Sequence, residues 1–554
     1  MRHARPLFVV FLLLAPPRLL AAQCDGKIVS AIATTRHAPS FLQVPRPLRA
    51  LARGVGLEHT TTTADVIRRF LALEVGQPCS DIRVAESERI LRFQPFLAEA
   101  TVRAVPDGAG GVRIEVETLD EIPTVFSLRL RHWHPRTLLL GDGNVAGRAV
   151  YAAAKLERGY HYRTGGGVQI VAYQAFARPY TLGVEAYRAP LGGTLRLAFG
   201  HAFITDLQRV AWHAGYSNVN AYRSFVEPDS GVHSLGLVRR FADVGAVRRI
   251  GFGRRIAFLG GLLTYERVTP DSQVVFIADS GLVADTSGAI GGPFPRYENV
   301  RMNAVVGLRT LSFLEVRGFD ALAAVQDVAR GVQFGLVAGQ GSDTFVSAEL
   351  YAGLGSEQSF GALRVEGEAR YDPGRSRWES VIASGRVAWY GRLSEAHVVI
   401  AGVEFSSGSR IRTPFQFTLG ASPGGVRGYR DSRVVGAARS VARVEERWSL
   451  GRLGGRVGVG LATFADAGRV WAGDAPFGVN SGLKAGVGAG LLVAAPPQSK
   501  RLWRLDFAVP VSPDAHARWD LRLTTVWVGG FWTEPRDVAQ LRAGAAPSLI
   551  FSWP

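Results

Sequence analysis

The stretch LGASPGGVRGYRDSR, residues 419–433, contains a pattern that is typical of covalent catalysis. Residues 420–424, GASPG, match the G-x-S-x-G sequence in which a serine is the nucleophile of a hydrolase. There the residue after the serine donates its backbone N–H to the oxyanion. Here that residue is Pro423, which has no N–H, and the glycine-rich sequence that follows is a poor helix. We therefore interpret the stretch as a loop, with a surface serine esterase that uses Ser422 as an alternative.

Three other patterns bear on metal or cofactor binding. His132 and His134 share one face of a strand and could bind a metal ion, but no third ligand stands at a suitable spacing. GVGAG at 486–490 superficially matches a dinucleotide loop, yet no βαβ unit surrounds it, and alternating glycines in a strand make room for bulky neighbours. GDGN at 141–144 lacks the acid spacing of a calcium loop. The sequence thus predicts no catalytic residue, metal site or cofactor, and no enzyme.

Residues 1–22 have the features of a secretory signal peptide. Arg2 and Arg5 precede an apolar run over 7–15, and small residues end the segment. The apolar run is too short to span a bilayer. We expect the mature chain to leave the cytoplasm.

The composition favours a membrane β-barrel, with a secreted all-β protein as the alternative. Of the 554 residues, 65 are glycine and 47% are hydrophobic, yet no apolar run reaches the ~18 residues of a spanning helix. The net charge is +17, or +14 without the three arginines of residues 1–22. This charge suits an arginine-lined lumen or anionic lipid, with a solvated surface as the alternative. No nucleic-acid-binding module is recognisable, so nucleic acid is not an expected partner.

Residues 23–122 differ from the rest of the chain. A short strand pattern, KIVSAIATTR, precedes two helical patterns, TTTADVIRRFLAL and SDIRVAESERILRF. Two strand patterns follow, LAEATVRAV and GVRIEVET, so we predict a small domain of order β-α-α-β-β. Cys24 and Cys79 both fall in it and could pair in an oxidising compartment, with two unrelated buried thiols as the alternative.

From residue 123 to residue 532, period-two alternation replaces helical patterns. In RLWRLDFAV (501–509) and WDLRLTTVW (519–527), apolar residues alternate with arginine and aspartate, which is typical of a barrel with lipid outside and a charged lumen. We therefore predict an all-β, antiparallel transmembrane barrel behind the small α/β domain. At about 25 residues per strand and connection, it would have about 16 strands. The residues expected to face outward are Leu505, Phe507, Leu521 and Leu523.

Four short motifs, in this order along the chain, resemble those of the BamA/TamA and two-partner-secretion transporter superfamily, also called the bacterial surface antigen family. They are Val426-Arg427-Gly428-Tyr429, RVEERWSL (443–450), FADAGRVW (464–471) and RLDFAVPV (504–511). The family's N-terminal POTRA modules have the order predicted for 23–122, which has room for one. The chain departs from the family at its end, because residues 533–554 extend past the usual final aromatic. The aromatic insertion signal would be either Trp532 or the pair Phe551 and Trp553.

The resemblance implies a bacterial outer-membrane protein with its N-terminal domain in the periplasm. Such proteins insert or export client polypeptides without ATP. An unfolded client would join the edge of the POTRA sheet as an added strand, and a seam between the first and last barrel strands would open to it. Outer-membrane lipids and other subunits of an assembly complex are the further partners implied. A passive porin is the alternative, although it needs no N-terminal α/β module.

The resemblance also implies a role for the glycine-rich loop. We expect residues 406–440 to fold into the barrel lumen, with the loop held there by Arg427. A guanidinium can grip a carboxylate with two hydrogen bonds and stays charged. Alternation places Glu445 on the lumen face, and Asp466 matches the family's acid that meets this arginine. We predict that Arg427 binds Asp466, Glu445 or both.

Overall fold

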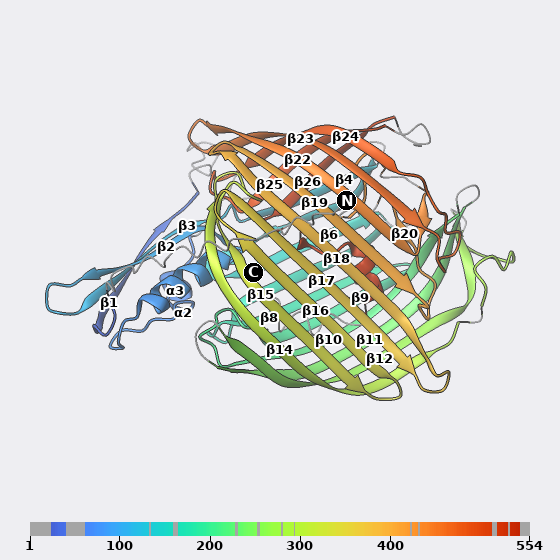
Figure 1. The fold of residues 1–554 in the computed structure, drawn as a ribbon, viewed down its shortest axis with the longest axis horizontal. Coiled ribbons are helices and arrows are strands. Elements are labelled where there is room, and N and C mark those ends of the chain that lie inside the picture. The colour runs from blue at the N-terminus through green and yellow to red at the C-terminus, as the bar shows by residue number, and fades with distance from the viewer. Residues whose placement is uncertain are drawn as a thin grey trace, which may run out of the picture.

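The structure of the chain, a computed structural model, consists of a small α/β unit beside one end of a large β-barrel (Figure 1). The predicted signal peptide lies outside the residues that the structure describes. Among the described residues, no helix is long and apolar enough to cross a bilayer. The described residues are 24–39, 61–131, 134–158, 164–227, 231–251, 255–278, 281–292, 294–420, 424–429, 433–511, 518–529 and 532–542.

The small unit has the order strand, helix, helix, strand, strand. Its elements are β1 (Val29–His37), α2 (Ala64–Arg69), α3 (Asp81–Phe93), β2 (Leu97–Pro106) and β3 (Val112–Asp120). The central strand β3 is parallel to β1 and antiparallel to β2. Alternate residues of β3, such as Val112 and Ile114, are buried against Ile67 of α2 and Leu91 of α3. This apolar core lets the two helices cover one face of the sheet.

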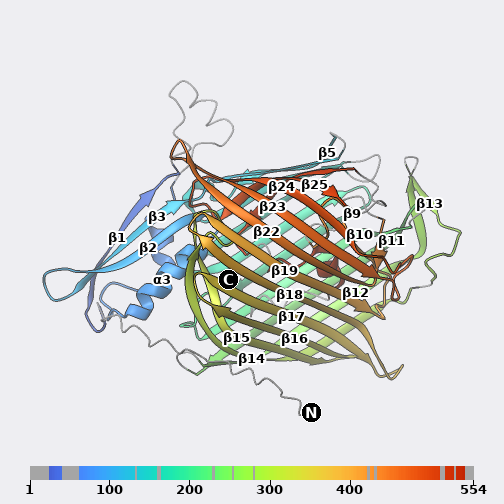
Figure 2. The ribbon, with the colours of Figure 1, turned by 45° about the horizontal axis from the view of Figure 1, so that its top comes forward.

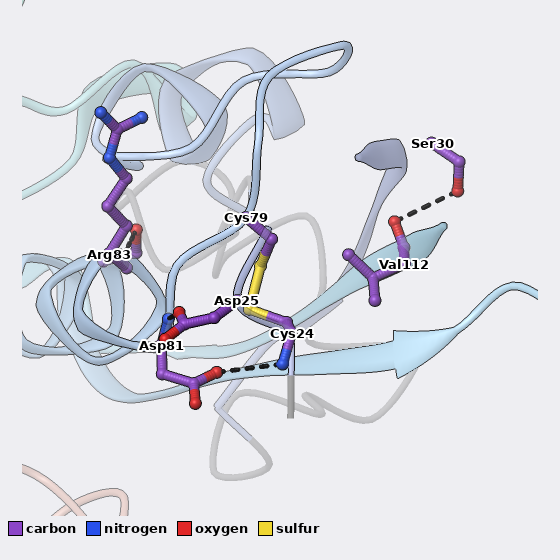
Figure 3. Close-up of a disulfide and its surroundings, with 8 residues drawn as sticks. Cys24, Asp25, Ser30, Cys79, Asp81, Arg83 and Val112 are labelled. Atoms are coloured by element: carbon purple, nitrogen blue, oxygen red, sulfur yellow. Dashed lines mark hydrogen bonds between the residues drawn. A yellow bond between two sulfur atoms is a disulfide. The ribbon is translucent and has the colours of Figure 1, made fainter. Parts of the chain in front are cut away.

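A disulfide joins Cys24 to Cys79 at one end of this unit (Figure 3). The two Cα atoms lie 5.6 Å apart, and 55 residues separate the cysteines in the sequence. The backbone N–H of Cys24 donates to Asp81 Oδ1 over 3.2 Å, and the N–H of Asp81 donates to Asp25 Oδ1 over 2.8 Å. Because Asp81 begins α3, the bridge ties the chain before β1 to the start of this helix.

Long antiparallel strands form the barrel, and nearly all neighbours in the sequence are neighbours in the sheet (Figure 2). The wall closes where β26 adjoins β4. The strands are β4 (Thr124–Arg131), β5 (His134–Asp142), β6 (Val150–Arg158), β7 (Thr164–Ala175), β8 (Tyr180–Ala189), β9 (Gly192–His201), β10 (Val210–Val226), β11 (Val232–Ile250), β12 (Ile256–Ala278), β13 (Gly281–Ala284), β14 (Tyr297–Arg317), β15 (Val325–Gln340), β16 (Thr344–Gly355), β17 (Ser359–Asp372), β18 (Arg377–Ser394), β19 (His397–Ser409), β22 (Ala438–Leu453), β23 (Val457–Trp471), β24 (Lys484–Ala494), β25 (Arg501–Pro510) and β26 (Asp520–Trp527).

The expected count of about 16 strands is too low. Within the described part of the chain the barrel sheet has 21 strands, of which β13 is a four-residue strand that pairs with the end of β12. The estimate assumed about 25 residues per strand and connection. Strands β4–β9 are shorter than that spacing allows, at 8 to 12 residues each. A tight turn also joins β8 directly to β9. More strands therefore fit into the same length.

The barrel wall has an apolar outer face and a charged inner face, as the alternation predicts. Arg504, Asp506 and Arg522 are buried on the inside. Phe507 lies opposite Leu521 in the register of β25 and β26, so apolar side chains meet across neighbouring strands. Such a continuous apolar surface suits lipid. The four residues expected to face outward are exposed by 41–51%: Leu505, Phe507, Leu521 and Leu523.

Helix α3 docks the small unit onto the barrel rim. Arg92, on the last turn of α3, donates to Asp327 of β15 from Nε over 3.0 Å and from Nη2 over 2.7 Å. The same Nη2 donates to Glu315 of β14 over 2.6 Å. Arg92 is only 8% exposed, so these charge-assisted hydrogen bonds are largely shielded from water.

A second set of contacts holds the unit from the segment just before β25. The Nζ of Lys500 donates to the carbonyl oxygens of Arg92 and Gln94. The carboxylate of Glu121, which follows β3, accepts hydrogen bonds from the backbone N–H of Lys500 and from Ser499 Oγ, each over 2.8 Å. The strands β16–β19 and β22–β24 separate β15 from β25 in the wall, so the unit bridges distant parts of the rim.

Candidate functional site

The glycine-rich loop leaves the wall after β19 and returns at β22, and it packs inside the barrel. Its two short strands, β20 (Phe417–Thr418) and β21 (Val435–Gly436), pair with each other. Val426 and Tyr429 are buried in a cluster with Val441 of β22 and Val470 of β23. The loop therefore rests on the inner face of the strands that follow it.

Arg427 grips two carboxylates of the barrel wall. Its Nε donates to Asp466 Oδ2 over 2.7 Å and its Nη2 donates to Asp466 Oδ1 over 2.8 Å, a bidentate pair. Its Nη1 donates to Glu445 Oε2 over 2.9 Å. The backbone N–H of Arg427 also donates to Asp466 Oδ2, over 3.1 Å. The structure thus brings together all three residues of the predicted contact, and we name them the Arg427 lock.

Neighbouring charges extend the lock into a balanced network. Arg504 donates to both oxygens of Glu445, over 2.8 and 2.9 Å, and to Asp506 Oδ1 over 3.1 Å. Arg447 donates to Glu445 Oε1 over 2.5 Å. The three arginines 427, 447 and 504 face the three carboxylates of Glu445, Asp466 and Asp506. Because charges of both signs are paired, this polar cluster can remain buried inside the wall.

Phe464 adds an aromatic contact to the lock. The guanidinium carbon of Arg427 lies 3.4 Å from the centre of the Phe464 ring, so a cation–π contact covers one face of the cation. Burial lowers the pKa of Arg427, but the pairing with Asp466 and Glu445 outweighs it and raises the pKa above its ordinary value. The guanidinium therefore stays charged, as a lock requires.

Glycines let the loop backbone approach the wall at two points. Gly428 has φ +93°, a conformation that L side chains rarely adopt. On the wall, a Cβ at Gly486 of β24 would lie 2.2 Å from the carbonyl oxygen of Arg427. The glycine of GVGAG at this point thus makes room for the loop, in agreement with the steric interpretation of that pattern.

Replacing Gly486 by Ala is expected to unseat the loop, because the new methyl group overlaps the Arg427 carbonyl. Overpacking of this kind costs about 1–3 kcal/mol. Protease sensitivity of the loop in the folded barrel measures the effect. Gly482→Ala is the matched control, since a Cβ there meets nothing within 4 Å. Equal protease resistance of the two variants would contradict the seating of the loop on Gly486.

The C-terminal segment also lies inside the barrel, which the sequence did not predict. Trp532 packs against Tyr351 with ring centres 6.2 Å apart, and its carbonyl oxygen accepts a hydrogen bond from Arg386 Nη1 over 2.8 Å. Trp532 is therefore turned toward the lumen and not toward lipid, so it is not placed as an outward-facing insertion signal. The other candidates, Phe551 and Trp553, lie outside the described residues.

A cavity of about 670 Å³ lies between the small unit, the barrel wall and this C-terminal segment. Aromatic side chains make much of its surface, joined by the charged residues of the docking contacts. The aromatic lining residues include Phe70, Phe93, Tyr173, Phe319, Tyr351 and Trp532.

The remaining chemical patterns give no catalytic or metal centre within the described residues. Ser422 and the side chains of both histidines, His132 and His134, lie outside them. Cys24, Asp25 and Asp81 come close enough together to suggest a metal site, but Cys24 is in a disulfide and offers no thiolate. Residues 141–144 connect the end of β5 to a short 3₁₀ turn, as a tight-turn sequence should.

Residues 334–522 match the profile of the Omp85 superfamily domain. Similar solved structures include BamA from Haemophilus ducreyi lacking POTRA domains 1-3, with 11% sequence identity, a TM-score of 0.39 and coverage of 90% of this chain and 83% of that one. No curated protein sequence matches the chain.

Two CdiB structures are also similar. CdiB from Acinetobacter baumannii has 10% identity and a TM-score of 0.43, with coverage of 90% of this chain and 73% of that one. CdiB from Escherichia coli has 11% identity and a TM-score of 0.43, with coverage of 93% of this chain and 92% of that one.

The matched residues contain the whole Arg427 lock and its network. The loop, both carboxylates of the lock and Arg504 all fall between residues 334 and 522. The resemblance seen in the sequence is confirmed over residues 334–522: the β-barrel of this chain carries an Omp85 superfamily domain.

Proposed function

We propose that this protein inserts client polypeptides into the outer membrane or translocates them across it, without ATP. The observation that carries the proposal is the Arg427 lock inside the Omp85 superfamily domain. It fixes a loop within the lumen by buried ion pairs, and it contains no group arranged to perform a chemical step. The free energy for the process would come from folding or insertion of the client itself.

The small unit acts in this proposal as a single POTRA-like domain in the periplasm that receives the client. Within the described residues, β1 pairs with β3 and with no other strand, so its other edge is free beyond Val29, whose backbone N–H donates to the carbonyl oxygen of Gln77 over 3.0 Å. Most of its residues are exposed. The other outer strand, β2, has an N–H already engaged, since Val102 donates to Glu88 Oε2 over 2.8 Å. An extended client segment would therefore add to β1 by main-chain hydrogen bonds.

The wall offers a place where a client could enter. The two strands that close the barrel, β4 and β26, have 8 residues each, whereas β12 has 23. A short pairing has few hydrogen bonds to break. We propose that this seam opens to client strands or lipid, which would make lipids and clients the partners of the barrel. Other subunits of an assembly complex would dock on the small unit.

Site-specific photocrosslinking in cells tests this proposal. A photoreactive residue in place of Thr35, exposed on β1, is expected to trap unfolded outer-membrane or secreted polypeptides. Arg83, exposed on α3, is the matched control position and should trap few of them. Mass spectrometry of the adducts identifies the clients. Adducts at Arg83 without adducts at Thr35 would contradict the β1 edge, and an absence of polypeptide adducts at both would contradict the function.

The alternative function, that of a passive porin, has less support than insertion or translocation of polypeptides. Contacts that cross the lumen, from the loop and from the C-terminal segment, occupy the space that a porin leaves open. Arg223 of β10, for example, donates to Thr413 Oγ1 and to the carbonyl oxygen of Pro414 on the loop, each over 3.1 Å.

A further inference from the structure

The C-terminal segment 532–542 contains two acidic residues, and one of them, Asp537, binds it to one side of the barrel interior, whereas Glu534 pairs with Arg542 of the same segment. The segment contains the short helix α4 (Arg536–Leu541). Asp537 of α4 accepts hydrogen bonds from Arg439 of β22, over 2.6 Å from Nη1 and 3.2 Å from Nη2. Arg439 is 1% exposed, and its Nη1 also donates to the carbonyl oxygen of Thr418 in the loop. The same guanidinium therefore holds the loop and the C-terminal segment together.

The segment reaches the opposite side of the interior through its backbone. The carbonyl oxygen of Gln540 accepts hydrogen bonds from Arg223 of β10, over 3.3 Å, and from Arg239 of β11, over 3.4 Å. By the shorter way round the wall, β12 and β14–β19 lie between β11 and β22. The segment thus spans the lumen from wall to wall.

Apolar contacts fill the space between these two attachments. Val538 is fully buried against Phe415 and Phe417 of the loop and Ile382 of β18. A Cβ at Gly424 would lie 2.7 Å from Pro535 Cγ, so the loop backbone and the segment are in direct contact. Loop and segment together form one layer across the interior.

The arginine side chains near Asp537 form a site that can bind a carboxylate. Three arginines surround the buried Glu404 at 3.6–3.8 Å: Arg386, Arg439 and Arg443. Glu366 and Glu534 also lie near Arg386, but the Nε and Nη2 of Arg386 have no hydrogen-bond partner among the described residues. Asp537 supplies a further negative charge to this group of positive charge. Without it, the guanidinium of Arg439 would keep only Glu404, at 3.7 Å, among the described carboxylates that pair with it.

We propose that this arginine group is a carboxylate-binding site in the lumen, and that residues 532–542 occupy it as an intramolecular ligand that closes the channel. When Asp537 leaves, the segment loses its ion pair on β22, and the lumen opens to water and to acidic segments of polypeptide. This does not depend on the proposed function, since channel closure can be measured with no client present.

Conductance of the full chain in planar lipid bilayers tests the proposal. Asp537→Arg places a cation against Arg439 and is expected to raise the time spent in the open state roughly tenfold, the change that loss of one charge-assisted contact produces. Arg536→Gln is the matched control, because Arg536 neighbours Asp537 but is exposed. Wild-type conductance of folded, heat-modifiable Asp537→Arg protein would overturn the proposal. Equal opening by Arg536→Gln would also overturn it.

A chain that ends at residue 531 tests the site itself. It should conduct continuously, and an added peptide of sequence TEPRDVAQLR should block it, whereas the same peptide with asparagine for Asp537 should block it at least several-fold less well. Equal block by the two peptides would overturn the carboxylate site. If the truncated chain does not assemble, the Asp537→Arg comparison decides the question alone.

Discussion

Replacing Arg427 by Ala is expected to cost the folded protein about 3–5 kcal/mol, because it leaves a buried carboxylate without its cation. The side chain of Asp466 is fully buried, and within the described residues its three hydrogen bonds all come from Arg427, two of them from the guanidinium. Glu445 would keep Arg504 and Arg447. The loop should loosen and the level of folded barrel should fall, as measured by the heat-modifiable fraction on gels.

Two comparisons make the Arg427 result specific. Arg456→Ala removes an exposed arginine in the turn after β22 and should leave the folded fraction unchanged. Combining Arg427→Ala with Asp466→Ala should recover part of the loss, since no unpaired buried charge remains. Ser422→Ala is expected to change nothing. If Ser422→Ala abolished function while Arg427→Ala did not, the loop would be an active site and the lock interpretation would be wrong.

Removing the disulfide is expected to destabilise the small unit by about 4 kcal/mol, the chain-entropy value for a loop of this length. The variant is Cys24→Ser with Cys79→Ser, compared with wild-type protein with and without reductant. Pulse proteolysis of the full chain across a urea series measures the stability of the small unit and of the barrel separately. The barrel should be unaffected. Reaction of both thiols with a labelling reagent in the native, unreduced protein would contradict the bridge.

The sequence predicts well what depends on local pattern. Period-two alternation placed Leu505 and Phe507 outside and Glu445 on the inner face, whereas the family resemblance indicated Asp466 as a partner of the arginine. The same alternation puts Phe464 on the face of Asp466, so its contact with Arg427 was accessible from the pattern but was not inferred.

Contacts between distant segments could not be predicted in this way. Asp537 and Arg439 are 98 residues apart, and Arg92 and Asp327 are 235 apart. Periodicity shows which face a residue occupies, but it does not show which residue lies opposite across a lumen. The predicted number of strands was too low for a related reason. Strands β4–β9 are short because tight turns connect them, and periodicity within a strand does not show where such turns fall.

The two docking contacts of the small unit also set an order of assembly. Glu121 meets the backbone of Lys500 from 379 residues away in the sequence, whereas the disulfide closes within the first 79 residues. Closing long loops is slow, and local structure forms first. The small unit can thus fold while most of the chain is still being delivered, but it can dock only after the segment before β25 has arrived. Docking is consequently a late event that marks a barrel whose wall is nearly complete.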